Sequence, residues 1–263
     1  MIKRQLTVSF LLVITLIGVP SAEAQRYCES PDPTAPNRSE VSLFVAGFSS
    51  STEKNVTPSS VSHLNWHEMT NQLLRAPALP ALVAGFRLVD APVAHEGAAE
   101  RTIRVQFVTA LYFEVLGVRA QMGRTFNGDE ERPEDNNAMA VISDHLWVSM
   151  FHLDPEVVGR TMKVNGRRVT IIGVAPPGFH GVLQPSEETL WLPGGSMPGA
   201  NNRAGSEGYA HFVVTLGDDV TWQEARRHFR ELPAKLVKAF PDVNQKFNSV
   251  SFYDSGLLTC SPR

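Results

Sequence analysis

The sequence has no excess of either charge. Its 24 lysine and arginine residues stand against 27 aspartate and glutamate residues, which gives a formal net charge of -3 over 263 residues. Lysine and arginine form no run anywhere, whereas a protein that binds nucleic acid needs a concentrated basic surface. The composition therefore excludes nucleic acid as an expected partner. Apolar residues make up 43%, so we expect a chain that folds around a hydrophobic core.

Motifs of common enzyme classes are also lacking. The sequence contains neither the Gly-x-Ser-x-Gly elbow of many hydrolases nor the Gly-x-x-x-x-Gly-Lys-Ser/Thr loop that cradles phosphate groups. We therefore predict that the protein is not an enzyme. We assign no catalytic residue, no cofactor, no cofactor-binding residue and no metal ligand.

Cysteine and long apolar runs are scarce. The two cysteines, Cys28 and Cys260, lie near opposite ends of the chain. In an oxidising compartment they would either form a disulfide that joins the ends or both stay unpaired, and the sequence leaves both alternatives open. No segment after residue 20 reaches the length of about 20 apolar residues that a membrane-spanning helix needs. Most of the protein is therefore expected to work in water.

The first residues predict export from the cytoplasm. Lys3 and Arg4 form a positive head, and residues 6–20 form an apolar stretch. The segment Ala22–Ala24 then offers the small-x-small pattern that precedes a signal peptidase cleavage site. We interpret residues 1–24 as a cleaved signal peptide or, alternatively, as an uncleaved N-terminal anchor. Either way, we expect a periplasmic protein whose membrane contact is limited to this segment.

The exported part divides into three regions. Residues 25–60 are rich in proline, serine, threonine and asparagine, and we predict a linker with at most one strand, in the apolar patch Val41–Phe48. Residues 61–255 are expected to form the core domain. Residues 256–263 form a short tail.

The most specific local signal is a β-hairpin over Thr161–Val174. Asn165 and Gly166 can supply the two positive-φ residues of a type I′ turn, the tightest connection between antiparallel strands. In that register Met162 faces the same side as Val169, and the polar residues face the other side. The hairpin is therefore expected to cover a core with one apolar face.

Strands and helices alternate irregularly around this hairpin. Apolar alternation predicts further strands at Leu82–Val89, Thr102–Val108, Ala138–Ile142, Thr189–Leu192, His211–Leu216 and Asn248–Tyr253. Helical spacing predicts helices at Ser62–Leu74, Ala110–Leu116, Ser143–Phe151 and, after a capping box, from Thr221 to Phe240. We expect Pro233 to kink or split this last helix. The pattern predicts an α+β fold with mixed sheets, a β-hairpin and two subdomains.

Some side chains in these elements have a predicted direction. The helix at Ala110–Leu116 is expected to turn four side chains inward: Leu111, Tyr112, Val115 and Leu116. Gly117 is well placed to end this helix in the left-handed conformation. We also expect three tryptophans in periodic elements to act as core anchors: Trp147, Trp191 and Trp222.

The segment Val108–Val118 carries a family resemblance. It reads Val-Thr-Ala-Leu-Tyr-Phe-Glu-Val-Leu-Gly-Val, and it resembles the VSxNYFxVLGV segment of MacB-like periplasmic core domains in MacB/FtsX-type ABC transporter permeases. Similar motifs follow in order at Gly123–Phe126, Ala140–Ser143, Leu146–Trp147, Asp154–Thr161, Val164–Gly166, Ile172–Phe179, Leu190–Pro193 and Phe240–Asp242. The resemblance covers about residues 60–253 and is specific because many motifs keep their spacing.

This resemblance implies a fold and a function. The fold would comprise a porter-like subdomain and an inserted subdomain, here without the membrane helices of a permease. The implied function is a non-catalytic periplasmic domain that acts through protein contacts in a transport or export assembly. Its expected partners are an inner-membrane permease or a periplasmic adaptor. The alternative is a stand-alone periplasmic protein that binds a solute or a lipid in an apolar pocket.

Two groups of residues resemble metal sites without completing one. His63 and His67 lie four residues apart, so a helix would place them on one face near Glu68, as in a zinc pair. A third ligand is not evident, and a secreted metal-dependent enzyme ranks behind the two functions above. The acidic segment Asp129–Asp135 is interrupted by an arginine and a proline, so we predict a solvated loop rather than a calcium site.

Overall fold

The computed structural model describes residues 43–49, 61–62, 66–67, 70, 81–95, 99–131, 138–182, 188–200, 208–216, 220, 222–239 and 249–253. The predictions for the segment 1–24, the tail 256–263 and the cysteines Cys28 and Cys260 concern residues outside this part of the chain.

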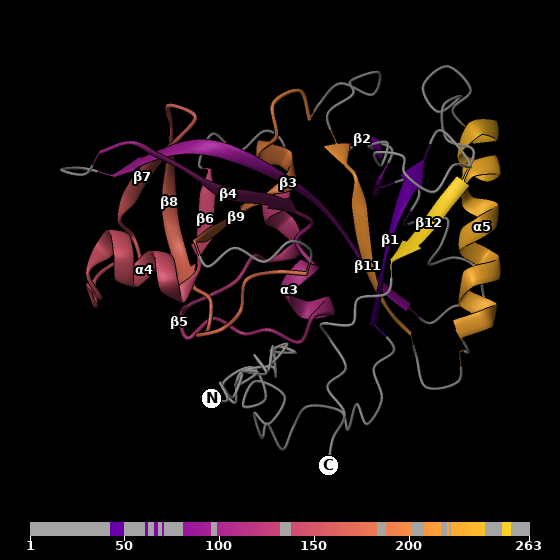
Figure 1. Ribbon diagram of the computed structural model, residues 1–263, viewed down its shortest axis with the longest axis horizontal. Coiled ribbons are helices and arrows are strands. Elements are labelled where there is room, and N and C mark those ends of the chain that lie inside the picture. Colours follow the sequence, from indigo (N-terminus) through magenta and orange to yellow (C-terminus); the bar gives the residue numbers. More distant parts are fainter. Residues whose placement is uncertain are drawn as a thin grey trace, which may run out of the picture.

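A mixed ten-stranded sheet organises the described residues (Figure 1). Its strands are β1 Leu43–Ser49, β3 Ala81–His95, β4 Arg101–Val108, β5 Met122–Gly123, β6 Met139–Ile142, β7 Thr161–Val164, β8 Arg167–Val174, β9 Thr189–Pro193, β11 His211–Leu216 and β12 Ser249–Tyr253. A separate antiparallel pair consists of β2 Val61–Ser62 and β10 Gly208–Tyr209. The helices are α3 Tyr112–Val115, α4 Asp144–Phe151 and α5 Trp222–Ala239, with 3-10 turns η1 Gly128–Glu131 and η2 Gly194–Ser196. The mixed sheet with helices confirms the predicted α+β class.

Six of the strands close into a barrel. β3 pairs with β4, β4 with β9, β9 with β6 and β6 with β8, in a mixture of parallel and antiparallel contacts. β7 then joins β8 to the far end of β3, where Val93 faces Val164. A closed ring of this size leaves no pore, because side chains fill its interior.

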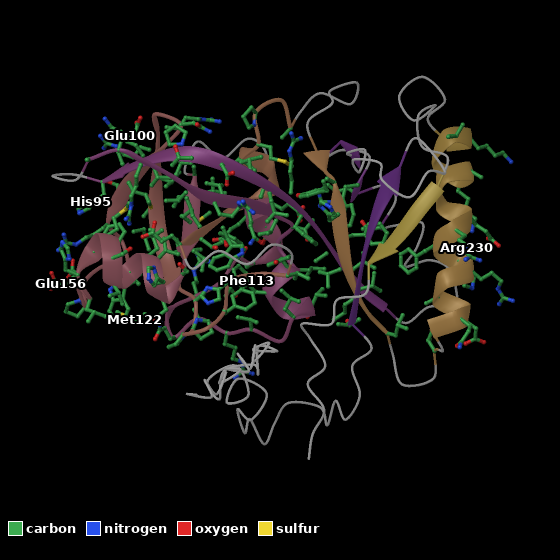
Figure 2. All side chains as sticks on the ribbon, in the orientation of Figure 1. His95, Glu100, Phe113, Met122, Glu156 and Arg230 are labelled. Atoms are coloured by element: carbon green, nitrogen blue, oxygen red, sulfur yellow. The ribbon has the colours of Figure 1, made fainter. Side chains whose placement is uncertain are left out.

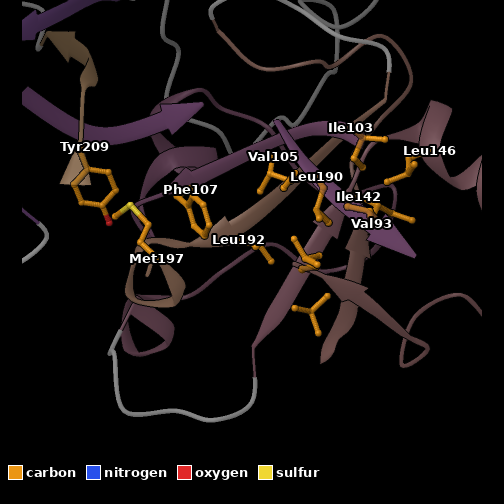
Figure 3. Packing of buried hydrophobic residues seen from close by; sticks show 14 of the residues in the cluster. Val93, Ile103, Val105, Phe107, Ile142, Leu146, Leu190, Leu192, Met197 and Tyr209 are labelled. Carbon is orange, nitrogen blue, oxygen red and sulfur yellow. The ribbon is translucent and has the colours of Figure 1, made fainter. Parts of the chain in front are cut away.

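Alternate residues of the barrel strands form the main core. In β4 the buried side chains of Ile103, Val105 and Phe107 point into the barrel, and Leu190 and Leu192 of β9 meet them there. Figure 3 shows these residues in a row, with Leu146 of α4 near one end and Met197 and Tyr209 near the other. Full burial of one such side chain contributes about 1.5–3 kcal/mol, so this interior dominates the stability of the barrel.

The outer face of β4, β9 and β6 is buried as well. A second cluster forms there around Trp191, whose ring lies 5.5 Å from Phe113 of α3 and 5.2 Å from Phe179. Figure 2 labels Phe113, a residue of α3, in the interior of the molecule. Both faces of this part of the sheet are therefore packed, which explains why β9 is apolar at nearly every position.

The other strands extend the sheet away from the barrel. The first half of β3 pairs with β11, β11 pairs with β1 and β1 pairs with β12. α5 lies against β12 on this side of the molecule, opposite the barrel in Figure 1. The single strand β3 thus runs from the barrel into the extension.

The predicted hairpin is confirmed in its register. Met162 pairs with Val169 and Lys163 with Arg168, as β7 and β8 alternate between buried and exposed positions. Asn165 and Gly166 have φ values of 49° and 74°, the positive angles that a type I′ turn requires.

Other local predictions are confirmed with changed boundaries. Ser143 caps α4 by accepting a hydrogen bond from the Leu146 backbone at 3.1 Å. Gly117 has a φ of 66° just after α3. α5 continues through Pro233 as one helix, so Pro233 does not split it, and the alternative of a kink stays a prediction. The strand expected within residues 25–60 forms as β1.

Three predictions of side-chain or strand placement are wrong. Leu111 precedes α3 and is 38% exposed, and Phe113 takes the inward position instead. Ser62 belongs to strand β2 and not to a helix N-terminus. β3 continues to His95, six residues beyond the predicted end at Val89, because its second half pairs with β4 and β7.

Candidate functional site

The predicted histidine pair does not gather a metal site in the described residues. His67 lies in a helical segment, half exposed, and its Nε2 is 3.8 Å from Oε1 of Glu131. His63 and Glu68 lie outside the described residues. Within the described part of the chain, no three His, Cys, Asp or Glu side chains come together as metal ligands. His67 thus has as a partner a carboxylate that the sequence analysis assigned to a solvated loop.

Among the described residues, Glu131 is unusual because it is a charged residue that is buried. It ends η1 and is only 8% exposed. Its Oε2 accepts a hydrogen bond from the Ala110 backbone at 3.2 Å, and its Oε1 accepts one from the Tyr209 hydroxyl at 2.9 Å. The prediction of a solvated acidic loop is therefore wrong for Glu131, which ties η1 to the end of β4 and to β10.

Tyr209 and Trp66 pack around this carboxylate. Both are buried, and their rings meet edge to face with centroids 5.1 Å apart. Two glycines make room for them: a Cβ on Gly85 would lie 2.8 Å from Tyr209 Cγ, and a Cβ on Gly194 would lie 1.6 Å from the Tyr209 hydroxyl. We call Glu131, Tyr209, Trp66 and His67 the junction cluster, because they connect η1 and β10 with β3 near the point where the barrel meets the extension.

Burial sets the protonation of the junction cluster. It raises the pKa of Glu131, although the charge of His67 and the hydrogen bonds from Ala110 and Tyr209 act in the opposite direction. Burial and the neighbouring Glu131 raise the pKa of Tyr209 well above its ordinary value. Tyr209 therefore remains a hydrogen-bond donor at physiological pH, and Glu131 remains its acceptor.

Glu131→Ala and Glu131→Gln should separate the role of this carboxylate as a hydrogen-bond acceptor from the role of its charge. The alanine variant leaves the Tyr209 hydroxyl and the Ala110 N–H without their acceptor, so we expect it to lower the free energy of unfolding by about 1–3 kcal/mol. The glutamine variant keeps an acceptor and should lose less. Urea unfolding followed by tryptophan fluorescence measures both, and an alanine variant as stable as the wild type would contradict the role of Glu131.

The same variants predict a pH dependence. The pKa of Glu131 in the folded protein is raised above 4.5. The protonated carboxyl therefore adds to the free energy of unfolding, fully so below pH 4.5, and this stabilisation is lost as the pH rises through the pKa of the folded state. Glu131→Gln should remove this loss, which amounts to about 1.4 kcal/mol per pH unit within that window. His211, whose pKa burial lowers to about 4, affects both proteins equally and cancels in the comparison.

A second buried polar group lies in the outer cluster. Gln106 of β4 is fully buried, and its Oε1 accepts hydrogen bonds from the Tyr112 hydroxyl at 3.1 Å and from Trp191 Nε1 at 3.2 Å. Its Nε2 donates to the backbone oxygen of His180 at 3.2 Å. A Cβ on Gly181 would lie 2.3 Å from Nε2, so the loop passes directly over the amide. The glutamine therefore fixes α3, β9 and this loop to one another.

The acidic segment contains a second paired carboxylate. Both oxygens of Glu130 accept hydrogen bonds from the Arg124 guanidinium, at 2.6 and 2.8 Å. Burial alone would raise the pKa of Glu130, but the bonds from Arg124 and from the Asn127 backbone lower it overall. Its carboxylate is thus engaged within the fold.

Two adjoining hollows open at one end of the barrel. One has a volume of about 40 Å³ and is lined mainly by apolar side chains, among them Phe107, Val164 and Leu192. The other has a volume of about 150 Å³ and is lined by Phe107, Met197, Pro198, Arg87, Val89, Asp90 and Asn165. We call them together the barrel mouth. Figure 3 shows Phe107 and Met197 beside each other at this end.

Sequence reasoning found few of these positions. The tryptophan prediction is confirmed for Trp191, which is fully buried, whereas Trp147 is half-buried and donates from Nε1 to the Asp154 backbone at 2.8 Å. The side chain of Trp222 lies outside the description. The burial of Gln106 could have been predicted, because it is the polar residue in the apolar run Val105–Val108. The burial of Glu131 could not have been predicted, because it lies in a segment rich in acidic residues.

Comparisons with known proteins agree on the fold. The periplasmic region of MacB from Actinobacillus actinomycetemcomitans superposes with a TM-score of 0.59 at 16% identity, over 81% of this chain and 88% of that one. The extracellular domain of the noncanonic ABC-type transporter YknZ from Gram-positive bacteria superposes with a TM-score of 0.58 at 15% identity, over 81% of this chain and 100% of that one. At these identities the likeness shows the fold alone.

A comparison with curated protein sequences gives no significant match. No helix among the described residues is long and apolar enough to cross a membrane. The family model of the MacB-like periplasmic core domain matches residues 38–232, nearly three quarters of the sequence, and this range contains the junction cluster and the barrel mouth. The chain therefore belongs to the family of MacB-like periplasmic core domains found in ABC transporter permeases.

Proposed function

We propose that this domain is non-catalytic and acts through protein contacts in a transport or export assembly. The observation that carries the proposal is the pairing of β1 with β12. Val45 near the start of β1 faces Tyr253 at the end of β12, in antiparallel register. The first and last described strands therefore lie side by side at one edge of the sheet, which supports this edge, away from the barrel, as the place where the domain joins an assembly.

The arrangement of the sheet supports a division into the two predicted subdomains. The porter-like subdomain comprises β1, β11, β12 and α5, which stand next to the two ends of the described chain. The inserted subdomain is the barrel, built from residues between β3 and β9. The porter-like part would face the membrane partner, and the barrel would extend from it.

β3 couples the two parts mechanically. It has 15 residues, and a strand rises by 3.2–3.4 Å per residue, so it reaches about 50 Å. Its first half pairs with β11 and its last residues pair with β7. A continuous hydrogen-bonded strand is a stiff connection, so a displacement at the extension would be passed to the barrel and not absorbed in a linker.

The buried polar groups support a non-catalytic role. A catalytic acid or base must reach the substrate, whereas both carboxylate oxygens of Glu131 are engaged by Ala110, Tyr209 and His67. The side-chain amide of Gln106 is likewise satisfied on both its oxygen and its nitrogen. These groups hold elements of the fold together.

A cross-linking pull-down from the periplasm tests the proposal. The tagged, exported protein is cross-linked in the native cell, and the captured proteins are identified by mass spectrometry, with an equally tagged, unrelated exported protein as the control. We expect specific recovery of an inner-membrane permease or of a periplasmic adaptor. Recovery of neither, from a monomer that co-purifies with a solute or lipid, would reject the proposal in favour of a stand-alone binding protein.

A further inference from the structure

Exposed apolar side chains gather at the end of helix α4. Four large apolar side chains are exposed among the described residues, and three of them lie within residues 148–158. Val148 on α4 is 42% exposed, and Leu153 and Val158 in the segment that follows are 53% and 40% exposed. The fourth, Leu111, lies elsewhere, just before α3. We call Val148, Leu153 and Val158 the α4 patch.

Hydrogen bonds fold the loop that carries the α4 patch against the helix. The backbone N–H of Leu153 donates to the backbone oxygen of Trp147 at 3.3 Å. In return, Nε1 of Trp147 donates to the backbone oxygen of Asp154 at 2.8 Å, and the Val157 N–H donates to the same oxygen at 3.2 Å. The patch is therefore held in place by the fold, as a surface that binds a partner without rearrangement requires.

The backbone at Leu153 is strained. Its φ is 61°, and the φ of the preceding His152 is 53°. This left-handed region disfavours residues with a Cβ atom, and glycine or asparagine usually occupies it at the end of a helix. Burial does not offset the strain, because more than half of the Leu153 side chain is exposed. A strained position that displays an apolar side chain is unfavourable for the domain alone, and such positions are concentrated at functional sites.

The α4 patch lies at the end of the molecule away from the extension. Figure 1 shows α4 beside the barrel at one end and α5 with β1 and β12 at the other. Figure 2 labels Glu156, next to the patch in sequence, and Arg230 of α5 at these opposite ends. The edge formed by β1 and β12, where the domain is proposed to join an assembly, and the α4 patch can therefore be in contact with other proteins at the same time.

The charge beside the patch is negative. Within residues 152–160, Arg160 pairs with Asp154 at 2.5 Å, whereas Glu156 is exposed and forms no ion pair with a described residue. α4 itself contains no lysine or arginine. Anionic lipid headgroups would be repelled by Glu156, and two copies joined patch to patch would bring their Glu156 carboxylates together. A protein with basic side chains beside an apolar surface is complementary in both respects.

We propose that the α4 patch docks a partner protein through an apolar stripe bordered by basic side chains, such as one face of an amphipathic helix. Leu153 is the anchor, Val148 and Val158 flank it, and Glu156 pairs with a lysine or arginine at the rim. An apolar centre with a polar rim is the usual anatomy of such interfaces. This inference rests on the proposed function, in which the domain acts through protein contacts, and it names the surface and the chemistry of the partner.

The test is fluorescence anisotropy with a labelled helical peptide that carries leucines along one face and lysines at the borders of that face. The whole protein should bind this peptide more tightly than a peptide of the same composition in scrambled order, which has no apolar face. We expect L153N to weaken binding by about tenfold, because it removes the anchor. E156Q should weaken binding by about threefold, and this difference should vanish at high salt because the ion pair lies at an exposed rim.

Two variants are matched controls. L111N makes the same chemical change at the exposed leucine outside the patch, where φ is an ordinary -78°. H152N changes the neighbouring left-handed residue and keeps Leu153. Both should bind the peptide like the wild type.

L153N also separates binding from folding. Asparagine tolerates the left-handed region better than leucine does, so the thermal midpoint of L153N should not fall below that of the wild type. A loss of affinity in this variant then cannot result from unfolding. Circular dichroism measures the thermal midpoint of each variant before binding is measured.

Several outcomes would overturn the proposal. A wild type that does not prefer the amphipathic peptide, or an L153N variant that binds it as well as the wild type does, would reject Leu153 as an anchor. A wild-type dimer that L153N separates into monomers on size-exclusion chromatography would make a second copy the occupant. Tighter binding of phosphatidylglycerol vesicles than of the peptide would make the occupant a lipid surface.

The pull-down distinguishes this inference from the proposed function. If L153N captures the permease or adaptor as well as the wild type does, the α4 patch is not the docking surface and the proposed function stands. If the wild type captures neither protein, the proposed function fails, and the inference that rests on it fails with it.

Discussion

Replacing Trp191 by alanine is expected to lower the free energy of unfolding by about 3–5 kcal/mol, the usual cost of removing a large buried aromatic side chain. The indole is fully buried, packs against Phe113 and Phe179 and donates to Gln106. Its removal would leave a cavity between β9, α3 and the loop that carries Phe179. Because β9 also forms part of the barrel wall, the substitution should weaken packing on both faces of the sheet.

Trp191→Phe is the matched variant. It keeps an aromatic ring in the cluster but loses the N–H that donates to Gln106, whose Oε1 still accepts from Tyr112. We expect a loss of about 1–3 kcal/mol. Urea denaturation followed by far-ultraviolet circular dichroism gives both values. If Trp191→Ala cost no more than Trp191→Phe, the ring packing would not anchor the outer cluster as described.

Local features of the fold could be predicted from the sequence. The Asn165–Gly166 turn fixes the hairpin register because positive φ is needed at two successive positions, and few dipeptides supply it. The cap of α4 is equally local, because Ser143 bonds a backbone N–H three residues away. Such features depend on neighbours in the chain, and a pattern of residues can therefore predict them.

The closure of the barrel could not be predicted from the sequence. Closure depends on the pairing of β7 with residues 93–95 of β3. The alternation of apolar and polar residues in a strand indicates which face is buried, but it does not indicate which other strand lies beside it. The same limit hid the junction cluster, since Glu131 finds Tyr209 across 78 positions of sequence. An acidic residue among acidic neighbours reads as solvated until the fold brings a donor to it.

The long strand β3 illustrates a related limit. Its first half is strongly apolar, but its second half contains Asp90 and Pro92, residues that disfavour strands. Pairing with β4 on one side holds this half in register, and Asp90 accepts a hydrogen bond from Arg104 at 2.7 Å. Tertiary pairing thus overrides local preference in the segment that links the barrel to the extension.

Gly194→Ala should disrupt the junction cluster from the opposite side to Glu131. Gly194 opens η2 directly after β9, and a Cβ there would overlap the Tyr209 hydroxyl at 1.6 Å. Tyr209 is fully buried and cannot yield easily, because Trp66 packs on its ring and Glu131 holds its hydroxyl. Overpacking of this kind typically costs 1–3 kcal/mol, and we expect about 3 kcal/mol because the overlap is direct.

Gly128→Ala is the matched control for this prediction. Gly128 begins η1, close in sequence to Glu131, yet a Cβ there would meet no atom within 4 Å, and its φ is not positive. The same chemical change should therefore alter the free energy of unfolding by less than about 0.5 kcal/mol. Thermal unfolding of the two variants side by side distinguishes a steric effect at Tyr209 from a general effect of replacing glycine. Equal midpoints would mean that Tyr209 moves aside at no cost, and the junction cluster would then be a loose contact unable to hold η1 and β10 to β3.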